Sequence, residues 1–97
     1  MGTVLVLERH PVQPGSKEAY EAWLGELLDA TRAQPGVLWT DAAEAFDDAP
    51  SFLVLSEWLT EGDLEAWESS EGYGTLTERA DPWLRESPMR RRFTDAG

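Results

Sequence analysis

The chain has 97 residues, which is the length of a single domain over residues 1–97 with no room for a second. Its 19 aspartates and glutamates against 8 lysines and arginines give a formal net charge of −11, which argues against nucleic acid or an anionic membrane as a partner. The absence of cysteine excludes disulfides and thiolate chemistry. The sequence shows neither a signal peptide nor an apolar run of membrane-spanning length, so we expect a cytoplasmic protein.

The first half of the chain is predicted to form a strand, a helix and a second strand. Four consecutive apolar residues from Val4 predict a strand over residues 3–12 that is buried on both faces. Residues 16–34 are predicted to be helical, with apolar or aromatic positions at helical spacing at Tyr20, Trp23, Leu24, Leu27, Leu28 and Thr31. A Pro-Gly pair ends this helix, and a second strand is expected over residues 37–46.

A short turn separates the second strand from a third. Residues 47–50, with the sequence DDAP, predict this turn. Residues 51–59 predict a strand that is apolar on both faces at its start. Because the turn is short, we expect the second and third strands to form an antiparallel hairpin.

A second helix is predicted after the third strand. Thr60 is its predicted N-cap, and Asp63 stands at the third helical position, where it would complete a capping box. The helix is expected to run to about Ser70. We expect Gly72 and Gly74 to interrupt it.

A helical piece over residues 75–84 and a strand over residues 88–94 complete the order β-α-β-β-α-β. This order predicts a ferredoxin-like α+β fold, in which an antiparallel four-stranded sheet carries its helices on one face. The other face would be bare, although the first and third strands are apolar on both faces. Since an exposed apolar face of this size marks an interface, we infer a homodimer in which two sheets stack on each other.

Three stretches follow one another along the chain: VLERHPVQPGSKEAYEAWLGEL, RAQPGVL and FLVLSEWLTEGDLEAWESSEGY. In this order and spacing they resemble the antibiotic biosynthesis monooxygenase (ABM) superfamily, whose members are dimeric α+β barrels. The resemblance covers nearly the whole chain. Members of this superfamily include cofactor-free oxygenases of quinols and anthrones, haem-degrading enzymes and proteins without known activity, so the fold alone does not settle the function.

The cofactor-free oxygenases are the branch that the resemblance favours. Trp67 and Tyr73 match the tryptophan and the tyrosine that these enzymes carry on a helix, six residues apart. The polar residue that contacts the substrate oxygen in this branch, often an asparagine, corresponds to Asp63, and Arg85 is the candidate for an arginine near the last strand. The resemblance implies that no cofactor and no metal are needed, because a deprotonated, electron-rich substrate can pass an electron to O₂ itself.

The remaining candidate residues follow from the chemistry of such a reaction. A small, flat aromatic or apolar ligand suits aromatic walls, for which Trp23 and Trp39 are further candidates. A base must remove the substrate proton, and His10, Asp63 and Glu57 are candidates for this role. Glu57 is also predicted as a substrate contact.

Haem degradation is the other activity known in the superfamily that the chain resembles. The histidine that ligates iron in that branch corresponds to Thr77, and threonine is not a haem ligand. Glu8 stands where that branch has an asparagine. Both differences argue against haem degradation, and with one histidine and no cysteine the chain also lacks the ligands of common zinc sites.

Ordinary packing and capping explain several of these residues as well. Trp67 and Tyr73 can belong to the core, Asp63 can be only a helix cap, and His10 can be a structural residue at the end of a strand. Two further functions stay open: a non-catalytic dimeric barrel that binds a small apolar ligand or acts as an accessory protein, and a cyclase of aromatic polyketides. A large apolar cavity beside Trp67 would favour an enzyme, whereas a cleft filled by aromatic side chains would favour the non-catalytic barrel.

Overall fold

A computed structural model of the chain describes residues 2–45 and 49–94, and these residues form one sheet and three α-helices. The strands are β1 (Val4–Pro11), β2 (Val37–Ala45), β3 (Ser51–Trp58) and β4 (Met89–Thr94). The α-helices are α1 (Lys17–Arg32), α2 (Glu61–Glu68) and α3 (Glu71–Ala80). Short 3₁₀ turns at Pro14–Ser16 and Asp81–Trp83 precede α1 and follow α3.

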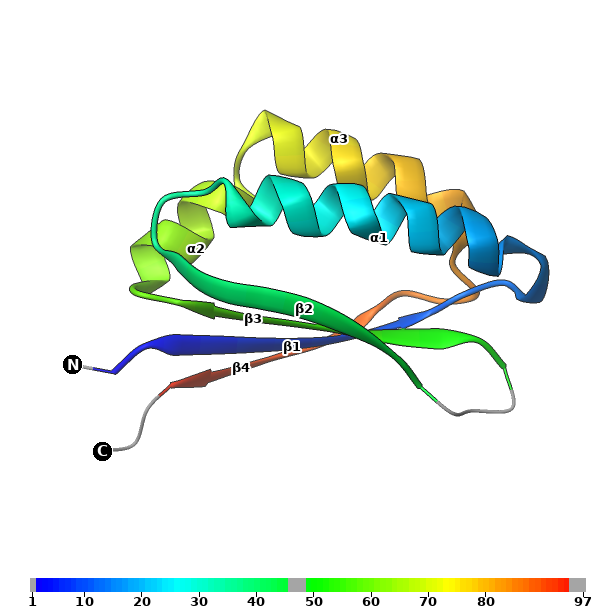
Figure 1. Cartoon of the computed structure of the whole chain (residues 1–97), viewed down its shortest axis with the longest axis horizontal. Coiled ribbons are helices and arrows are strands. Elements are labelled where there is room, and N and C mark those ends of the chain that lie inside the picture. Colours follow the sequence, from blue (N-terminus) through cyan, green and yellow to red (C-terminus); the bar gives the residue numbers. More distant parts are fainter. Residues whose placement is uncertain (1, 46–48, 95–97) are drawn as a thin grey trace.

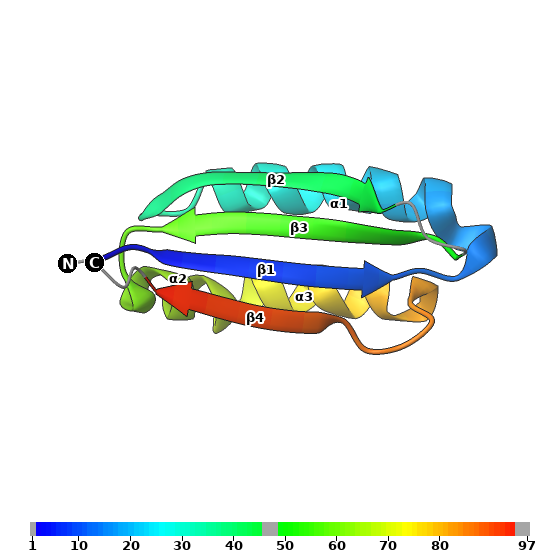
Figure 2. The same cartoon turned by 90° about the horizontal axis from the view of Figure 1, so that it is seen from below.

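The four strands pair antiparallel in the order β2-β3-β1-β4. The α-helices lie together on one side of this sheet (Figure 1), and the view from below shows the opposite face of the strands with the helices behind it (Figure 2). Since β1 and β2 are connected through α1 while β3 lies between them, the topology is the ferredoxin-like α+β fold. The predicted fold class is confirmed.

The hydrophobic core lies between the helices and the inner face of the sheet. Successive side chains of a strand point to opposite faces, and in β1 and β3 the even-numbered residues point toward the helices. The stripe of apolar residues along α1 packs onto them. The buried core residues are Val4, Val6, Val12, Tyr20, Trp23, Leu24, Leu27, Phe52, Val54, Trp58, Leu64, Trp67 and Ala80.

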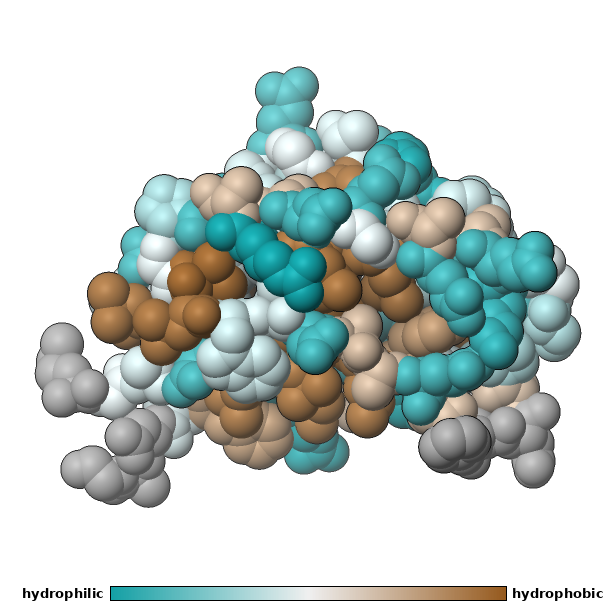
Figure 3. Space-filling model, viewed as in Figure 1, coloured by the Kyte–Doolittle hydropathy of each residue, from teal (hydrophilic) through white to brown (hydrophobic). Residues whose placement is uncertain are grey.

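The odd-numbered residues of the strands form a second face, here termed the outer face. It includes Leu5, Leu7, Leu53, Leu55, Trp39, Met89 and Phe93. Leu7 pairs with Leu55 at its centre. In the part of the chain that the structure describes, no helix covers this face (Figure 2), and hydrophobic side chains are visible along the lower edge of the molecule (Figure 3). The predicted homodimer would cover these residues, and it stays a prediction.

The break between the second and third helices lies at Ser69 and Ser70. Ser70 is the N-cap of α3, and its Oγ accepts a hydrogen bond of 3.2 Å from the backbone N–H of Tyr73. The prediction that Gly72 and Gly74 interrupt the helix is wrong, because both lie inside α3 and neither has a positive φ. The serine hydroxyl therefore sets the boundary, and the glycines adopt the helical backbone that follows it.

The strands begin and end within one residue of their predicted bounds, but part of one connection cannot be compared. Phe46, the predicted last residue of the second strand, and the turn residues Asp47 and Asp48 lie outside the described residues. The antiparallel pairing of β2 with β3 nevertheless confirms the predicted hairpin.

Gly36 turns the chain from α1 into β2. Its φ is +85°, a conformation that favours glycine, and a Cβ atom there would come within 2.2 Å of Asp63 Oδ2. The backbone carbonyl of Gly36 also accepts a hydrogen bond of 2.7 Å from the N–H of Leu59. The start of α2 is thus packed against the turn between α1 and β2.

Candidate functional site

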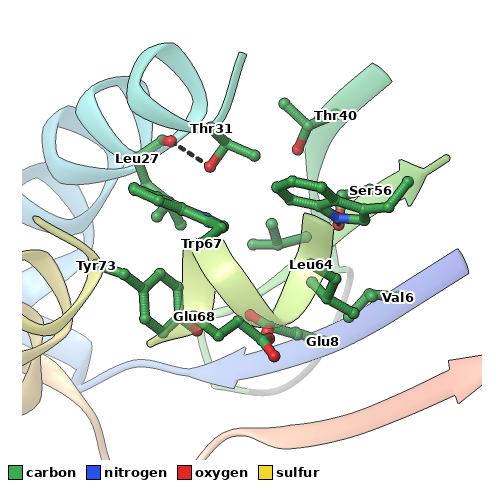
Figure 4. A pocket seen from close by; sticks show the side chains of 12 residues that line it. Val6, Glu8, Leu27, Thr31, Thr40, Ser56, Leu64, Trp67, Glu68 and Tyr73 are labelled. Atoms are coloured by element: carbon green, nitrogen blue, oxygen red, sulfur yellow. Dashed lines mark hydrogen bonds between the residues drawn. The ribbon is translucent and has the colours of Figure 1, made fainter. Parts of the chain in front are cut away.

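A small cavity lies between the helices and the inner face of the sheet (Figure 4). It is lined by Val6, Glu8, Leu27, Thr31, Thr40, Val54, Ser56, Trp58, Leu64, Trp67, Glu68 and Tyr73. We term it the Trp67 cavity. Its volume of about 30 Å³ leaves room for about two water molecules.

Two aromatic residues predicted from the sequence meet in the wall of the Trp67 cavity. The ring of Trp67, a residue that is 6% exposed, lies 5.3 Å from the ring of Tyr73 in a T-shaped contact. Burial raises the pKa of Tyr73 to about 12, and the nearby Glu8 carboxylate adds to this shift. Tyr73 is therefore a neutral phenol at physiological pH.

A chain of three polar side chains leads from the cavity wall into the protein. His10 Nε2 lies 2.8 Å from Glu8 Oε1, and His10 Nδ1 is hydrogen-bonded to the hydroxyl of Tyr20. His10 and Tyr20 are both buried, and burial raises the pKa of Tyr20, so its hydroxyl keeps its proton. With a neutral imidazole that carries its proton on Nε2, Tyr20 donates to His10 and His10 donates to Glu8.

Glu8 is a cavity residue that sequence reasoning did not select. Its side chain is only 15% exposed, and Glu8 Oε2 lies 3.5 Å from Arg90 Nε on β4. Arg90 also pairs with Glu68 of α2. The signal for Glu8 was present in the sequence, because it follows Val4 and Val6 at alternate positions of a strand and must point to the same inner face.

A second cavity lies further along β1 and has a volume of about 140 Å³. It is lined by His10, Tyr20, Trp23, Thr77, Ala80, Asp81, Leu84 and Pro88. We term it the Trp23 cavity. The indole N–H of Trp23 donates a hydrogen bond of 2.8 Å to the backbone carbonyl of Leu76, which ties α1 to α3 at this point. The structure thus brings together His10 and Trp23, two of the predicted site residues.

Asp63, another predicted site residue, lies at the start of α2. The hydroxyl of Thr60 donates to Asp63 Oδ2 at 2.9 Å, and the backbone N–H of Asp63 donates to Thr60 Oγ1 at 3.1 Å. This is the predicted capping interaction. Asp63 does not line either of the two cavities described above.

The other three predicted residues also lie away from Trp67. Trp39 and Glu57 are on the outer face, where Trp39 Nε1 donates to Glu57 Oε1 at 2.7 Å, so the sheet separates both from the cavity. Arg85 donates from Nε to the backbone carbonyl of Val12 at 3.1 Å and ties the segment after α3 to the end of β1. Substrate contacts by these residues stay a prediction.

A family model described as antibiotic biosynthesis monooxygenase matches residues 3–79 of the chain. The match runs from β1 into α3 and includes both sides of the Trp67 cavity. The chain belongs to the antibiotic biosynthesis monooxygenase family. No curated protein sequence matches this family member.

Solved structures of similar fold cover nearly all of this ABM protein. An antibiotic biosynthesis monooxygenase-like protein from Nitrosomonas europaea has a TM-score of 0.90 at 18% identity, over 99% of this chain and 93% of that one. Rv0793 from Mycobacterium tuberculosis has a TM-score of 0.88 at 19% identity, over 98% and 96%. A mutant of SnoaB, a cofactor-independent oxygenase from Streptomyces nogalater, has a TM-score of 0.86 at 15% identity, over 98% and 94%. At these identities the likeness establishes the fold alone.

Two observations concern the metal and haem ligands considered in the sequence. Within residues 2–45 and 49–94, no three His, Asp or Glu side chains are grouped as ligands for a metal ion. The hydroxyl of Thr77, at the position expected for a haem ligand, donates to the backbone carbonyls of Tyr73 and Gly74 at 3.1 and 3.0 Å. No helix in the described part of the chain is long and apolar enough to cross a membrane.

Proposed function

We propose that this ABM protein is a cofactor-independent monooxygenase that oxidises a quinol-like or polycyclic aromatic substrate with O₂. The observation that carries the proposal is the position of Glu8. Its carboxylate lines a cavity beside the rings of Trp67 and Tyr73. The buried His10 is hydrogen-bonded to one oxygen of this carboxylate. Family membership supports the proposal, as does the shared fold with a cofactor-independent oxygenase.

Glu8 is the proposed base. A carboxylate at the wall of a largely apolar cavity can take a proton from an activated C–H or O–H group of an aromatic substrate. The substrate anion then gives one electron to O₂, and the resulting radical pair combines to a peroxide that takes the proton back from Glu8. Loss of water from the hydroperoxide leaves a carbonyl group. For an anthrone the balance is CH₂ + O₂ → C=O + H₂O, with one oxygen atom in the product and one in water.

His10 and Tyr20 are proposed as positioning residues for this base. The hydrogen bond from His10 fixes one carboxylate oxygen of Glu8, and the bond to Tyr20 fixes the tautomer and the orientation of the imidazole ring. The other carboxylate oxygen of Glu8, Oε2, lies 3.5 Å from Arg90 Nε, and we expect this oxygen to take the proton from the substrate.

Arg90 is proposed as the charge that stabilises the substrate anion. The sequence predicted Arg85 as a substrate contact, but Arg90 is the arginine that lies beside Glu8, whereas Arg85 donates to the backbone carbonyl of Val12. When Glu8 has taken the proton, its own charge is neutralised and the substrate anion becomes the partner of the guanidinium.

The homodimer is part of the proposal, because the apolar centre of the outer face is exposed to solvent in a single chain. Leu5, Leu7, Leu53 and Leu55 lie at its centre, and each stays partly exposed in a single chain. A second copy of the same sheet brings the same leucines, so a two-fold axis through the face would pair apolar surface with apolar surface. Light scattering is expected to give twice the mass of the chain.

The second candidate function is a non-catalytic barrel that binds a small apolar ligand. The observation that favours it is the size of the Trp67 cavity, about 30 Å³, whereas ligand pockets of enzymes usually measure about 300–1,000 Å³. In this alternative Trp67 and Tyr73 serve mainly as core residues.

Oxygen consumption with a panel of quinols and anthrones, without added metal or cofactor, separates the two functions. We expect turnover by the wild type and a fall of about 10²–10⁴-fold for Glu8→Gln, because the base is lost while the side-chain shape is kept. Trp67→Phe should also lower turnover, and Glu65→Gln, on the exposed side of α2, is the matched control that should not. Turnover that survives Glu8→Gln would refute the role of Glu8, and a protein that binds these aromatics without consuming oxygen would support the non-catalytic barrel.

A further inference from the structure

The charged residues of the outer face lie on opposite halves of the sheet. Asp41 on β2 and Glu57 on β3 are acidic, whereas Arg9 on β1 and Arg91 on β4 are basic. Because the strand order is β2-β3-β1-β4, this face carries negative charge on one half and positive charge on the other half (Figure 2). The leucines of β3 and β1 lie between Asp41 and Arg91.

The middle row of the outer face consists of Asp41, Leu55, Leu7 and Arg91, in that order from β2 to β4. The Cα partners in the sheet are Asp41 and Leu55, Leu55 and Leu7, and Leu7 and Arg91. The row thus runs from an acidic residue through two leucines to a basic residue. If a second copy of the row is turned end to end, it presents opposite charge to each charge and leucine to each leucine. The row is therefore complementary to a reversed copy of itself.

The two charges at the ends of this row are available to a partner. Arg91 is exposed, and its side chain makes no ion pair or hydrogen bond with any other residue that the structure describes. Its neighbours on β4 differ, because Arg90 and Arg92 both pair with Glu68 on the helix side of the sheet. Asp41 is also exposed, and its Oδ1 accepts a hydrogen bond of 2.8 Å from the backbone N–H of Ala42. The second carboxylate oxygen of Asp41 can still accept from an arginine.

Two aligned sheets that stack face to face can be related by a two-fold axis in two ways. The axis lies between the sheets, at the apolar centre, and runs either along the strands or across them. With the axis along the strands, β2 of one copy lies over β4 of the other, and Asp41 faces the partner's Arg91. With the axis across the strands, β2 lies over β2, so that Asp41 faces the partner's Asp41 and Arg91 faces the partner's Arg91. Facing like charges disfavour the second arrangement.

A second row of the outer face favours the same axis. It consists of Trp39, Glu57, Leu5 and Phe93, again from β2 to β4. A hollow of about 240 Å³ lies beside Phe93 and is lined by Thr3, Leu5, Glu57, Phe93 and Thr94. Trp39 is 42% exposed and Phe93 is 46% exposed. With the axis along the strands, the indole of each Trp39 lies over the partner's hollow, whereas the other axis places it over the partner's Ala43.

We infer that a second copy of this chain stacks on the outer face with its strands running in the same direction, so that Asp41 of each copy pairs with the partner's Arg91. Two such ion pairs, one on each side of the leucines, select this orientation of the dimer. Stacked sheets lie about 10 Å apart, a distance that an aspartate and an extended arginine span together. The inference rests on the homodimer in the proposed function, and it adds the orientation of the two copies and the charges that determine it.

Cross-linking of introduced thiols distinguishes the two axes. The chain has no cysteine, so a short bismaleimide reacts only with introduced ones. Asp41→Cys and Arg91→Cys proteins, mixed in urea and refolded together, should give a cross-linked dimer. Each variant alone should not, because equal positions of the two copies are offset by three strand spacings, about 14 Å, along the sheets. The axis across the strands predicts the reverse, a cross-link in each variant alone.

Neutral variants test the charges themselves. The dissociation constant of the dimer is measured by sedimentation equilibrium at low salt. Asp41→Asn and Arg91→Gln should each weaken the dimer about two- to thirtyfold, because each removes both ion pairs. The double variant should not weaken it further, since the same pairs are lost. Asp29→Asn, on the exposed side of α1, is the matched control and should leave the dissociation constant unchanged.

The outcomes are separable from those that test the proposed function. A dimer in which Asp41→Cys alone is cross-linked, in which the mixture gives no cross-link, or which Asp41→Asn strengthens would overturn the inference and leave the homodimer standing. A wild type that sediments as a monomer would overturn both. If only the mixture is cross-linked and both neutral variants weaken the dimer, the inference holds, and a lack of oxygen consumption would then refute the monooxygenase alone.

Discussion

The two faces of the sheet use the same strands and differ in what covers them. On the inner face of β1, the apolar Val4 and Val6 are followed by the polar Glu8 and His10. The helices therefore cover polar side chains as well as apolar ones. On the outer face, leucines fill the centre of the sheet, and no helix in the described part of the chain covers them. The inner face is covered although it carries charge. The outer face is uncovered although leucines form its centre, with the charged residues Arg9, Asp41, Glu57 and Arg91 around them. A buried charge and an uncovered apolar surface are both uncommon in monomeric proteins. They are the observations on which we propose a reaction site on the inner face and a partner surface on the outer face.

The same charge placed on two neighbouring residues of β1 should affect the two faces differently. Val6 is 3% exposed on the inner face and Leu7 lies on the outer face. Val6→Asp buries a carboxylate without a partner and should lower the free energy of unfolding by about 3–5 kcal/mol, measured by urea denaturation. Leu7→Asp should leave each chain folded and convert the dimer to a monomer, measured by light scattering.

A wild-type protein that is already monomeric at micromolar concentration would refute the outer face as a dimer interface. Because a dimer is stabilised by concentration, the two variants should be compared at several protein concentrations. A loss in Leu7→Asp as large as that in Val6→Asp, at a concentration where the wild type is itself dissociated, would show that the two faces are equally important for the fold of one chain.

The tyrosines give a second test, since the chain has two of them and both lie on the helix side of the sheet. Burial raises the pKa of both, that of Tyr73 from 10.0 to about 12. The folded state therefore holds these protons more tightly than the unfolded state. The stabilisation is complete below pH 10 and is lost as the pH rises from there toward the folded pKa, by up to about 1.4 kcal/mol per pH unit for each tyrosine.

Ultraviolet absorbance of the phenolate measures this directly. We expect little phenolate at pH 10 in the native protein, and its appearance together with unfolding at higher pH. The same protein in strong denaturant should titrate near pH 10, and Tyr73→Phe should shift the alkaline unfolding transition to higher pH. Ordinary titration of both tyrosines near pH 10 without unfolding would mean that the inner face is open to water.

The sequence predicted the strands better than the breaks between the helices. Alternation and apolar runs predict a strand directly, because the side-chain period of two is a local property. The start of α3 was predicted at residue 75 instead of Glu71, because Gly72 and Gly74 were given more weight than Ser70, whose hydroxyl caps this helix. An N-cap is decided by one side-chain hydrogen bond, and the hydroxyl groups of Ser69 and Ser70 were both candidates for it.

The candidate site was predicted in part for a similar reason. Trp67 and Tyr73 lie together, but on α2 and α3 and not on one helix as the resemblance implied, and His10 lies beside Trp23. Glu8 could have been selected from its inward register, but the division into two cavities could not. That division depends on side chains from β1, α1 and α3 that are far apart in the sequence, and cavity volume follows from how they interlock.

Asp63 gives the smallest expected effect, because it belongs to neither face. It caps α2 through Thr60 and lies against Gly36, away from both cavities. Asp63→Ala should lower the free energy of unfolding by about 1 kcal/mol, and Asp63→Asn by less, since an amide oxygen still accepts the hydrogen bond from Thr60. Thr60→Ala and the double variant complete a cycle in which the two losses should not add, because they remove one interaction. Oxygen consumption should stay within about twofold for Asp63→Asn if the carboxylate only caps the helix, whereas a fall comparable to that of Glu8→Gln would move the base to the start of α2.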